Sequence, residues 1–198
     1  MTVSVVDICN MALEQIGGSS IISLEQDSTP AKACARFYAA NRDAVLRAYP
    51  WNCATERDSL AAATAAPAWG YAYQYQLPVD SLRVLQIADM IVKPAQRSDG
   101  TGLFKIEKRW IRTDIEAPLP IVYIERIEDP ALFDPMLVEV LAARLAASIA
   151  YRVTGSQSAT EAALQVYRAR ALEARSIDAQ EGAPDELRAG AEWLEARL

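Results

Sequence analysis

Acidic side chains gather at two points in this sequence. Glu56 and Asp58 form one group, and Glu125, Glu128 and Asp129 form the other. Paired carboxylates can hydrolyse glycosides when they face each other a few ångströms apart. Nothing in the spacing fixes such a separation, and acidic residues just before a long helix are explained by attraction to its positive end. Hydrolysis of a cell-wall glycan through Glu56 or Glu125 therefore remains only the alternative function.

Other signals for catalysis are missing from the sequence. Histidine, the commonest acid–base residue, is absent. There is no phosphate-binding loop, no dinucleotide glycine fingerprint and no nucleophile elbow. Cys9, Cys34 and Cys53 lack metal-type spacing and have no histidine to activate them, so we expect free thiols. The sequence predicts no enzyme activity, no cofactor and no metal.

Aromatic and basic residues offer candidate contact surfaces. The aromatic set is Trp51, Trp69, Tyr71, Tyr73 and Tyr75, and its three tyrosines alternate along the chain as in a strand. The set is suited either to stacking on bases or sugars, or to packing a β core or a subunit interface. Lys105, Lys108, Arg109 and Arg112 make a basic spot on an expected hairpin, interpreted as a solvated hairpin or as a contact with passing DNA or an acidic partner. The interface candidates are Trp51, Tyr71, Tyr73, Tyr75, Lys108, Arg109, Trp193 and Leu194.

Bulk properties restrict the class of protein. The length of 198 residues suggests one domain with an elaborated insertion, and 52% hydrophobic residues suffice for a core. A net charge of −6 argues against a basic nucleic-acid surface. The first residues lack a positively charged signal region, and charges break the longest apolar run, so we expect a soluble protein made in a cytosol, with no membrane partner.

The elements that must position these residues are mainly helical. The expected helix over residues 130–153 is apolar on nearly all sides, so we expect it at the centre of the fold. Asp134 is its expected cap, and Gly155 lies just past its end. Ser4 with Asp7, and Ser158 with Glu161, are capping-box patterns. We expect an α+β, mainly α fold, a helical bundle around one long central helix. The helix ranges are 4–16, 30–48, 130–153 and 159–180.

The pattern of the sequence changes between the second and third expected helices. Over about residues 52–127, short extended segments alternate with turns, which indicates an inserted small antiparallel β region. Residues 1–182 are expected to form one domain. Residues 183–198 form a C-terminal tail in which Trp193 indicates docking, either on the chain's own core or on a partner.

Several stretches, in order and spacing, resemble the tail tubular protein A family, the head-to-tail adaptors of tailed phages. They are Ile8-Cys-Asn-Met-Ala-Leu-Glu-Gln-Ile-Gly17, Tyr49-Pro-Trp-Asn-Cys-Ala54, Tyr73-Gln-Tyr-Gln-Leu-Pro-Val-Asp80, Leu82-Arg-Val-Leu85 and Asp129-Pro-Ala-Leu-Phe-Asp-Pro135. The similarity covers about residues 3–182. No single stretch is specific, whereas the ordered set is fairly so.

This resemblance implies a structural role in a phage or prophage virion. Such an adaptor assembles as a ring, twelve-fold in the virion, between the portal protein and the tail nozzle protein, around a channel for DNA. An acidic chain suits a channel that must not bind DNA tightly. The implied location is the head–tail junction of the virion, and the host cytoplasm during assembly. By analogy, the C-terminal segment is expected to reach the portal.

Overall fold

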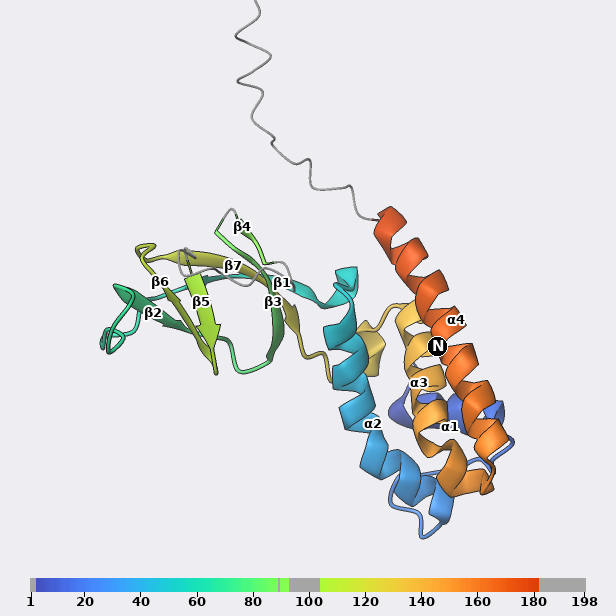
Figure 1. Ribbon diagram of the computed structural model, residues 1–198. Coiled ribbons are helices and arrows are strands. Elements are labelled where there is room, and N and C mark those ends of the chain that lie inside the picture. The colour runs from blue at the N-terminus through green and yellow to red at the C-terminus, as the bar shows by residue number, and fades with distance from the viewer. Residues whose placement is uncertain (1–2, 89, 93–103, 182–198) are drawn as a thin grey trace, which may run out of the picture.

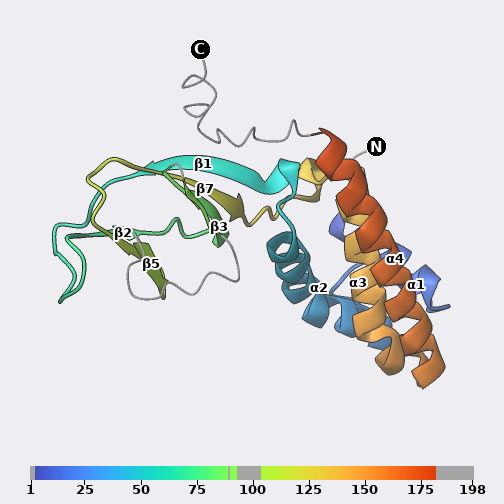
Figure 2. The same ribbon diagram turned by 45° about the horizontal axis from the view of Figure 1, so that its top comes forward.

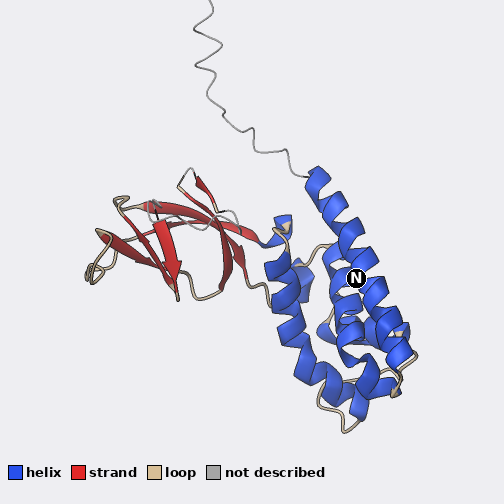
Figure 3. Cartoon of the chain, viewed as in Figure 1, coloured by secondary structure: helices blue, strands red, loops and turns tan. Residues whose placement is uncertain are grey.

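A computed structural model describes residues 3–88, 90–92 and 104–181, with the side chains of residues 91 and 181 left out. Within these ranges the chain has a mixed α+β fold, with four α-helices and two small antiparallel sheets. The helices form one lobe and the sheets form another beside it (Figure 1, Figure 3). The chain passes from the helical lobe into the β lobe after α2 and returns before α3.

The first two helices begin and end at local signals. Helix α1 spans Val5–Gln15 and has the expected capping box, in which the Asp7 N–H donates to the Ser4 side chain and Asp7 accepts from the Ser4 N–H. It ends just before Gly17, whose φ of +71° is left-handed. Helix α2 spans Thr29–Ala48, is capped by Ser28 and ends before Pro50.

Helix α3, Pro135–Thr154, packs against α1, α2 and α4 and is mostly buried. Asp134 caps its start, where its Oδ1 accepts from the Met136 N–H at 2.7 Å. Gly155 follows its end with φ +68°. The expected start at residue 130 was wrong: Pro130–Leu132 is a separate 3₁₀ turn (η2). Residues preceding proline avoid the helical region, so Asp134 is extended and the two pieces are separated.

Helix α4, Gln157–Glu181, runs beside α3 (Figure 1). Its first turn is capped by Ser156, whose Oγ accepts from the Ala159 N–H at 3.2 Å. The expected capping box between Ser158 and Glu161 was therefore wrong by two residues. The shift follows from Gly155, which ends α3 and leaves Ser156 as the first residue free to cap α4.

The β lobe contains two sheets that share one apolar core. The first has the order β1-β7-β3-β4 and the second β2-β6-β5, with neighbouring strands antiparallel throughout. Side chains from both sheets, such as Tyr75, Ile111 and Ile121, meet in this core. The strands are β1 Thr55–Leu60, β2 Tyr73–Gln76, β3 Ser81–Ile87, β4 Met90–Ile91, β5 Phe104–Glu107, β6 Trp110–Thr113 and β7 Leu119–Glu125.

The junction between the lobes is made of short, specific contacts. Trp51 follows α2 and is buried in the helical core, while the 3₁₀ turn η1, Asn52–Ala54, leads directly into β1. Strand β7 carries Tyr123 into the β core and Ile124 into the helical core, because successive side chains on a strand point to opposite faces. Figure 2 shows β1 and β7 side by side where they leave the helices.

Candidate functional site

Two of the expected interface aromatics are core residues. Trp51 is 1% exposed, and its indole Nε1–H donates to the Val45 carbonyl at 3.0 Å. Tyr75 is fully buried between the sheets, and its hydroxyl donates to the Ile115 carbonyl at 2.7 Å. Burial raises the pKa of the Tyr75 hydroxyl above its ordinary value. Both residues stabilise the folded chain and offer no surface to a partner, which corrects the expectation for them.

Tyr71 and Tyr73 are partly exposed near the same end of the β lobe. The Tyr73 hydroxyl donates to Glu116 Oε1 at 3.4 Å. The most exposed aromatic among the described residues is Trp69, which is 81% exposed on the β1–β2 connection. Sequence reasoning grouped Trp69 with the other aromatics but did not select it, although the neighbouring Gly70 indicates a surface turn. Trp193 and Leu194 lie outside the described residues.

The expected basic spot divides into two parts. Lys105 and Arg112 are both paired with Glu107, at 2.8 and 2.6 Å. A hydrogen bond from Lys105 lowers the pKa of Glu107, and the same bond raises the pKa of Lys105. Lys108 and Arg109 form the turn of the β5–β6 hairpin, with Lys108 at φ +56°. Neither Lys108 nor Arg109 forms an ion pair with a described carboxylate. Both line a larger cleft.

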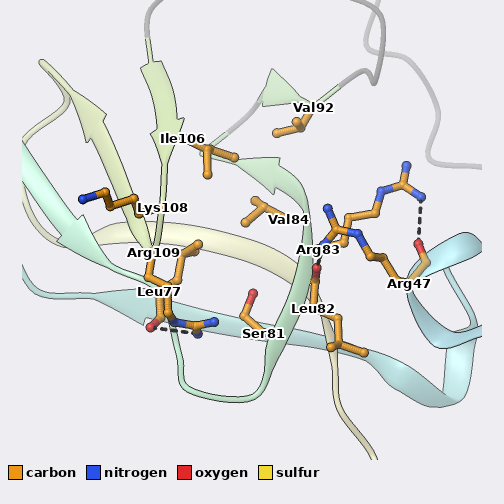
Figure 4. Close-up of a pocket in the computed structure, with 10 residues that line it drawn as sticks. All are labelled: Arg47, Leu77, Ser81, Leu82, Arg83, Val84, Val92, Ile106, Lys108 and Arg109. Carbon is orange, nitrogen blue, oxygen red and sulfur yellow. Dashed lines mark hydrogen bonds between the residues drawn. The ribbon is translucent and has the colours of Figure 1, made fainter. Parts of the chain in front are cut away.

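That feature is a cleft of about 480 Å³ at the seam between the lobes, termed the basic cleft below. It is formed by the end of α2, the start of β3, the end of β4 and the β5–β6 hairpin (Figure 4). Among the described lining residues four are cationic and none is a carboxylate; the cations are Arg47, Arg83, Lys108 and Arg109. The other lining residues are Leu77, Ser81, Leu82, Val84, Val92 and Ile106. Such a site suits an anionic group attached to an apolar one.

Acidic groups meet elsewhere, where β3 and β7 pair. Ser81 lies opposite Glu125 in the register, so Asp80 is close to Glu125. Burial raises the pKa of Glu125, and the negative charges of Asp80 and Glu56 raise it further. A hollow of about 530 Å³ lies at Asp80, but Glu125 does not line it. Asp80 and Glu125 therefore do not face each other across this hollow.

The three cysteines among the described residues are free thiols. Cys9 and Cys34 are buried neighbours, and Cys53 is an exposed free thiol whose pKa is raised mainly by desolvation. A thiol with a raised pKa is a poor nucleophile at neutral pH. Within the described ranges no cluster of three or more possible ligands is placed to hold a metal ion.

None of the helices in the described part of the chain is long and apolar enough to cross a membrane. No family model and no curated protein matches this chain.

Proposed function

We propose that this chain is a head-to-tail adaptor of a tailed phage or prophage, a structural protein that forms a ring between the portal and the tail nozzle. The ordered resemblance to tail tubular protein A supports the family. The α+β architecture, with a helical part and a β part, is compatible with the helical bundle and β insertion which that resemblance implies.

The observation that carries the proposal is the location of exposed apolar side chains, some of them large, on α4 and on the β lobe. Along the outer side of α4, exposed apolar residues recur at helical spacing, at Ala162, Val166, Ala169 and Ile177. On the β lobe, Trp69 is 81% exposed. Helix α4 and the β1–β2 connection lie at opposite ends of the molecule (Figure 1).

A closed ring of identical subunits requires this kind of arrangement. Each subunit must present two different patches that fit head to tail, so that one copy's first patch meets its neighbour's second. Single exposed apolar residues are normal on the surface of a monomer, whereas contiguous groups of them mark interaction sites. The α4 stripe and the β-lobe end are suited to be such a pair of patches.

The experiment is to mix the chain with the portal protein of the same phage or prophage and to image the product by electron microscopy. The expected product is the portal with a ring of this chain below it. Val166→Arg, on the α4 stripe, is expected to abolish the ring. Arg168→Glu, an exposed residue away from the stripe, is the control and should leave the ring intact. Portal particles without any added ring would contradict the proposal.

One observation favours the alternative, a glycan hydrolase. The raised pKa of Glu125 beside Asp80 is typical of a general acid. The test is release of reducing ends from purified cell-wall glycan, compared between the chain and its Glu125→Gln variant. We expect no release by either protein, because Glu125 does not reach the hollow at Asp80. Release that the variant abolishes would establish the hydrolase instead.

A further inference from the structure

The basic cleft holds a positive charge that described carboxylates do not neutralise. Arg47, Arg83, Lys108 and Arg109 take part in none of the ion pairs formed among the described residues. By contrast, Arg112 on the neighbouring strand is paired with Glu107 at 2.6 Å. Unpaired like charges in one cleft repel each other and favour an anionic occupant.

The three guanidinium groups are positioned by backbone carbonyls. Arg47 donates to the Leu82 carbonyl, Arg83 to the Arg47 carbonyl at 3.5 Å, and Arg109 to the Pro78 carbonyl. Each guanidinium has five N–H groups, so these contacts leave donors for a ligand. A cation that is already positioned loses less conformational entropy when a carboxylate binds.

The centre of the cleft is apolar. In Figure 4, Val84, Val92 and Ile106 lie between Arg47 and Arg83 on one side and Lys108 and Arg109 on the other. Ile106 is 37% exposed, although it shares a strand face with Phe104, which packs on the β core. A complementary ligand would therefore have large apolar groups flanked by carboxylates.

This chain carries such a sequence after α4. Residues 185–198 contain Trp193 and Leu194 directly between Glu192 and Glu195, with four acidic and two basic residues in total. Residues 93–103, which are next to the cleft in sequence, contain Lys93 and Arg97 against Asp99 alone. The net charge of residues 93–103 is therefore positive, which is the same sign as the charge of the cleft.

The last described turns of α4, which precede this segment, contact the residues that follow α2. Near the end of α4, the Asp178 carbonyl accepts from Asn52 Nδ2 at 2.8 Å, and the Arg175 carbonyl accepts from the Tyr49 hydroxyl at 3.1 Å. Arg47, in the last turn of α2, is two residues before Tyr49. Eleven residues separate Glu181 from Trp193, and an extended chain reaches about 33 Å in ten residues.

We propose that residues 185–198 bind in the basic cleft of their own chain, with Trp193 and Leu194 on the apolar centre and Glu192 and Glu195 facing the flanking cations. Because the segment is tethered, its effective concentration at the cleft is in the millimolar range or above, and weak contacts suffice for occupancy. The proposal concerns the chain by itself and does not depend on the adaptor function.

The test uses the full chain with a photoreactive benzophenone amino acid in place of Trp193. After irradiation, mass spectrometry is expected to locate adducts on cleft residues such as Leu82 and Ile106. In an equal mixture of ¹⁵N-labelled and unlabelled chains, the adducts should join peptides of one isotope only. Adducts mainly outside the cleft, adducts that join two isotopes, or no adducts would overturn the proposal.

A charge exchange tests the recognition itself. Arg83→Glu is expected to lower the adduct yield by on the order of tenfold, because an attraction becomes a repulsion. Adding Glu192→Arg alone or Glu195→Arg alone to that variant should restore part of the yield for the glutamate that faces position 83, because the other glutamate keeps its cationic partners. Arg36→Glu, exposed on α2 away from the cleft, is the matched control and should change nothing. Equal yields in all these variants would contradict the assigned contacts.

A polyanion such as DNA is the competing occupant. A short fluorescent duplex is titrated into the full chain and into the Trp193→Ala, Leu194→Ala double variant, which has the same net charge. If the segment occupies the cleft, the double variant binds the duplex more tightly. Equal binding by both proteins, lost in Arg83→Glu, would mean that the cleft is open to DNA and that the proposal is wrong.

Discussion

The carboxylate of Asp178 near the end of α4 accepts a hydrogen bond from the backbone N–H of Asn52 at 3.1 Å, across 126 residues of sequence. Asp178 is 5% exposed, and Asn52 begins the turn that leads into β1. The last described turns of α4 are thereby joined to the point where the chain leaves the helical lobe.

We expect Asp178→Ala to destabilise the chain by about 1–3 kcal/mol, because hydrogen bonds to a charged acceptor are among the stronger ones. The measurement is urea unfolding followed by circular dichroism. Asp178→Asn keeps a side-chain acceptor, so it should lower the free energy of unfolding clearly less than Asp178→Ala does. Equal losses in the two variants would show that the hydrogen bond to Asn52 is not the cause.

Leu145 lies in the fully buried part of α3. Leu145→Ala is expected to cost about 2–5 kcal/mol, because it leaves a cavity among packed helices. Leu172→Ala on α4 removes the same atoms from a side chain that is 71% exposed, and should change the free energy of unfolding by about 0.5 kcal/mol or less. Thermal and urea unfolding of both variants provide the comparison, and similar losses would contradict the placement of α3 at the centre.

Gly155 ends α3 with φ +68°, and its N–H donates to the Tyr151 carbonyl at 2.9 Å. A Cβ at this position would meet no atom within 4 Å, so the cost of a side chain is a backbone cost alone. Gly155→Ala is expected to lose about 1 kcal/mol, and Gly155→Asn less, since asparagine tolerates the left-handed region better. Unfolding curves for the two variants test this order. If the cost were steric, Gly155→Asn would be the more destabilised variant, because asparagine is larger than alanine.

Glu125 should make the stability depend on pH. Its pKa in the folded chain is raised, first by burial and then by the charges of Asp80 and Glu56. Its ionisation therefore opposes folding as the pH rises from the unfolded-state pKa of about 4.3 through the higher folded value. Glu125→Gln is expected to stabilise the chain at neutral pH, and the difference should vanish below about pH 4.

Glu107 supplies a control of opposite sign. Lys105 lowers its pKa, so its ionised form favours folding at pH values above the unfolded-state pKa. Glu107→Gln should therefore destabilise the chain at neutral pH, with a difference that also disappears in acid. Urea unfolding at a series of pH values would measure both variants. The same sign for the two would contradict the environments described for them.

Local signals determined much of the fold from the sequence alone. The Ser4–Asp7 capping box, Gly17, Pro50, Asp134 and Gly155 act within a few residues, so helix ends could be read directly. Two boundaries were wrong where neighbouring signals competed, at Pro130–Leu132 before Pro135 and at Ser156 before Ser158. The alternation of Tyr71, Tyr73 and Tyr75 likewise placed an extended segment near β2.

Only the tertiary structure decided which of these residues are available for function. Trp51 and Trp69 are the same residue type, yet long-range packing buries the first and leaves the second 81% exposed. The pairing of β1 with β7, the proximity of Asp80 to Glu125, and the meeting of Arg47 with the β5–β6 hairpin all join distant parts of the chain. Such contacts depend on how whole elements pack, and periodicity along the chain carries no information about them.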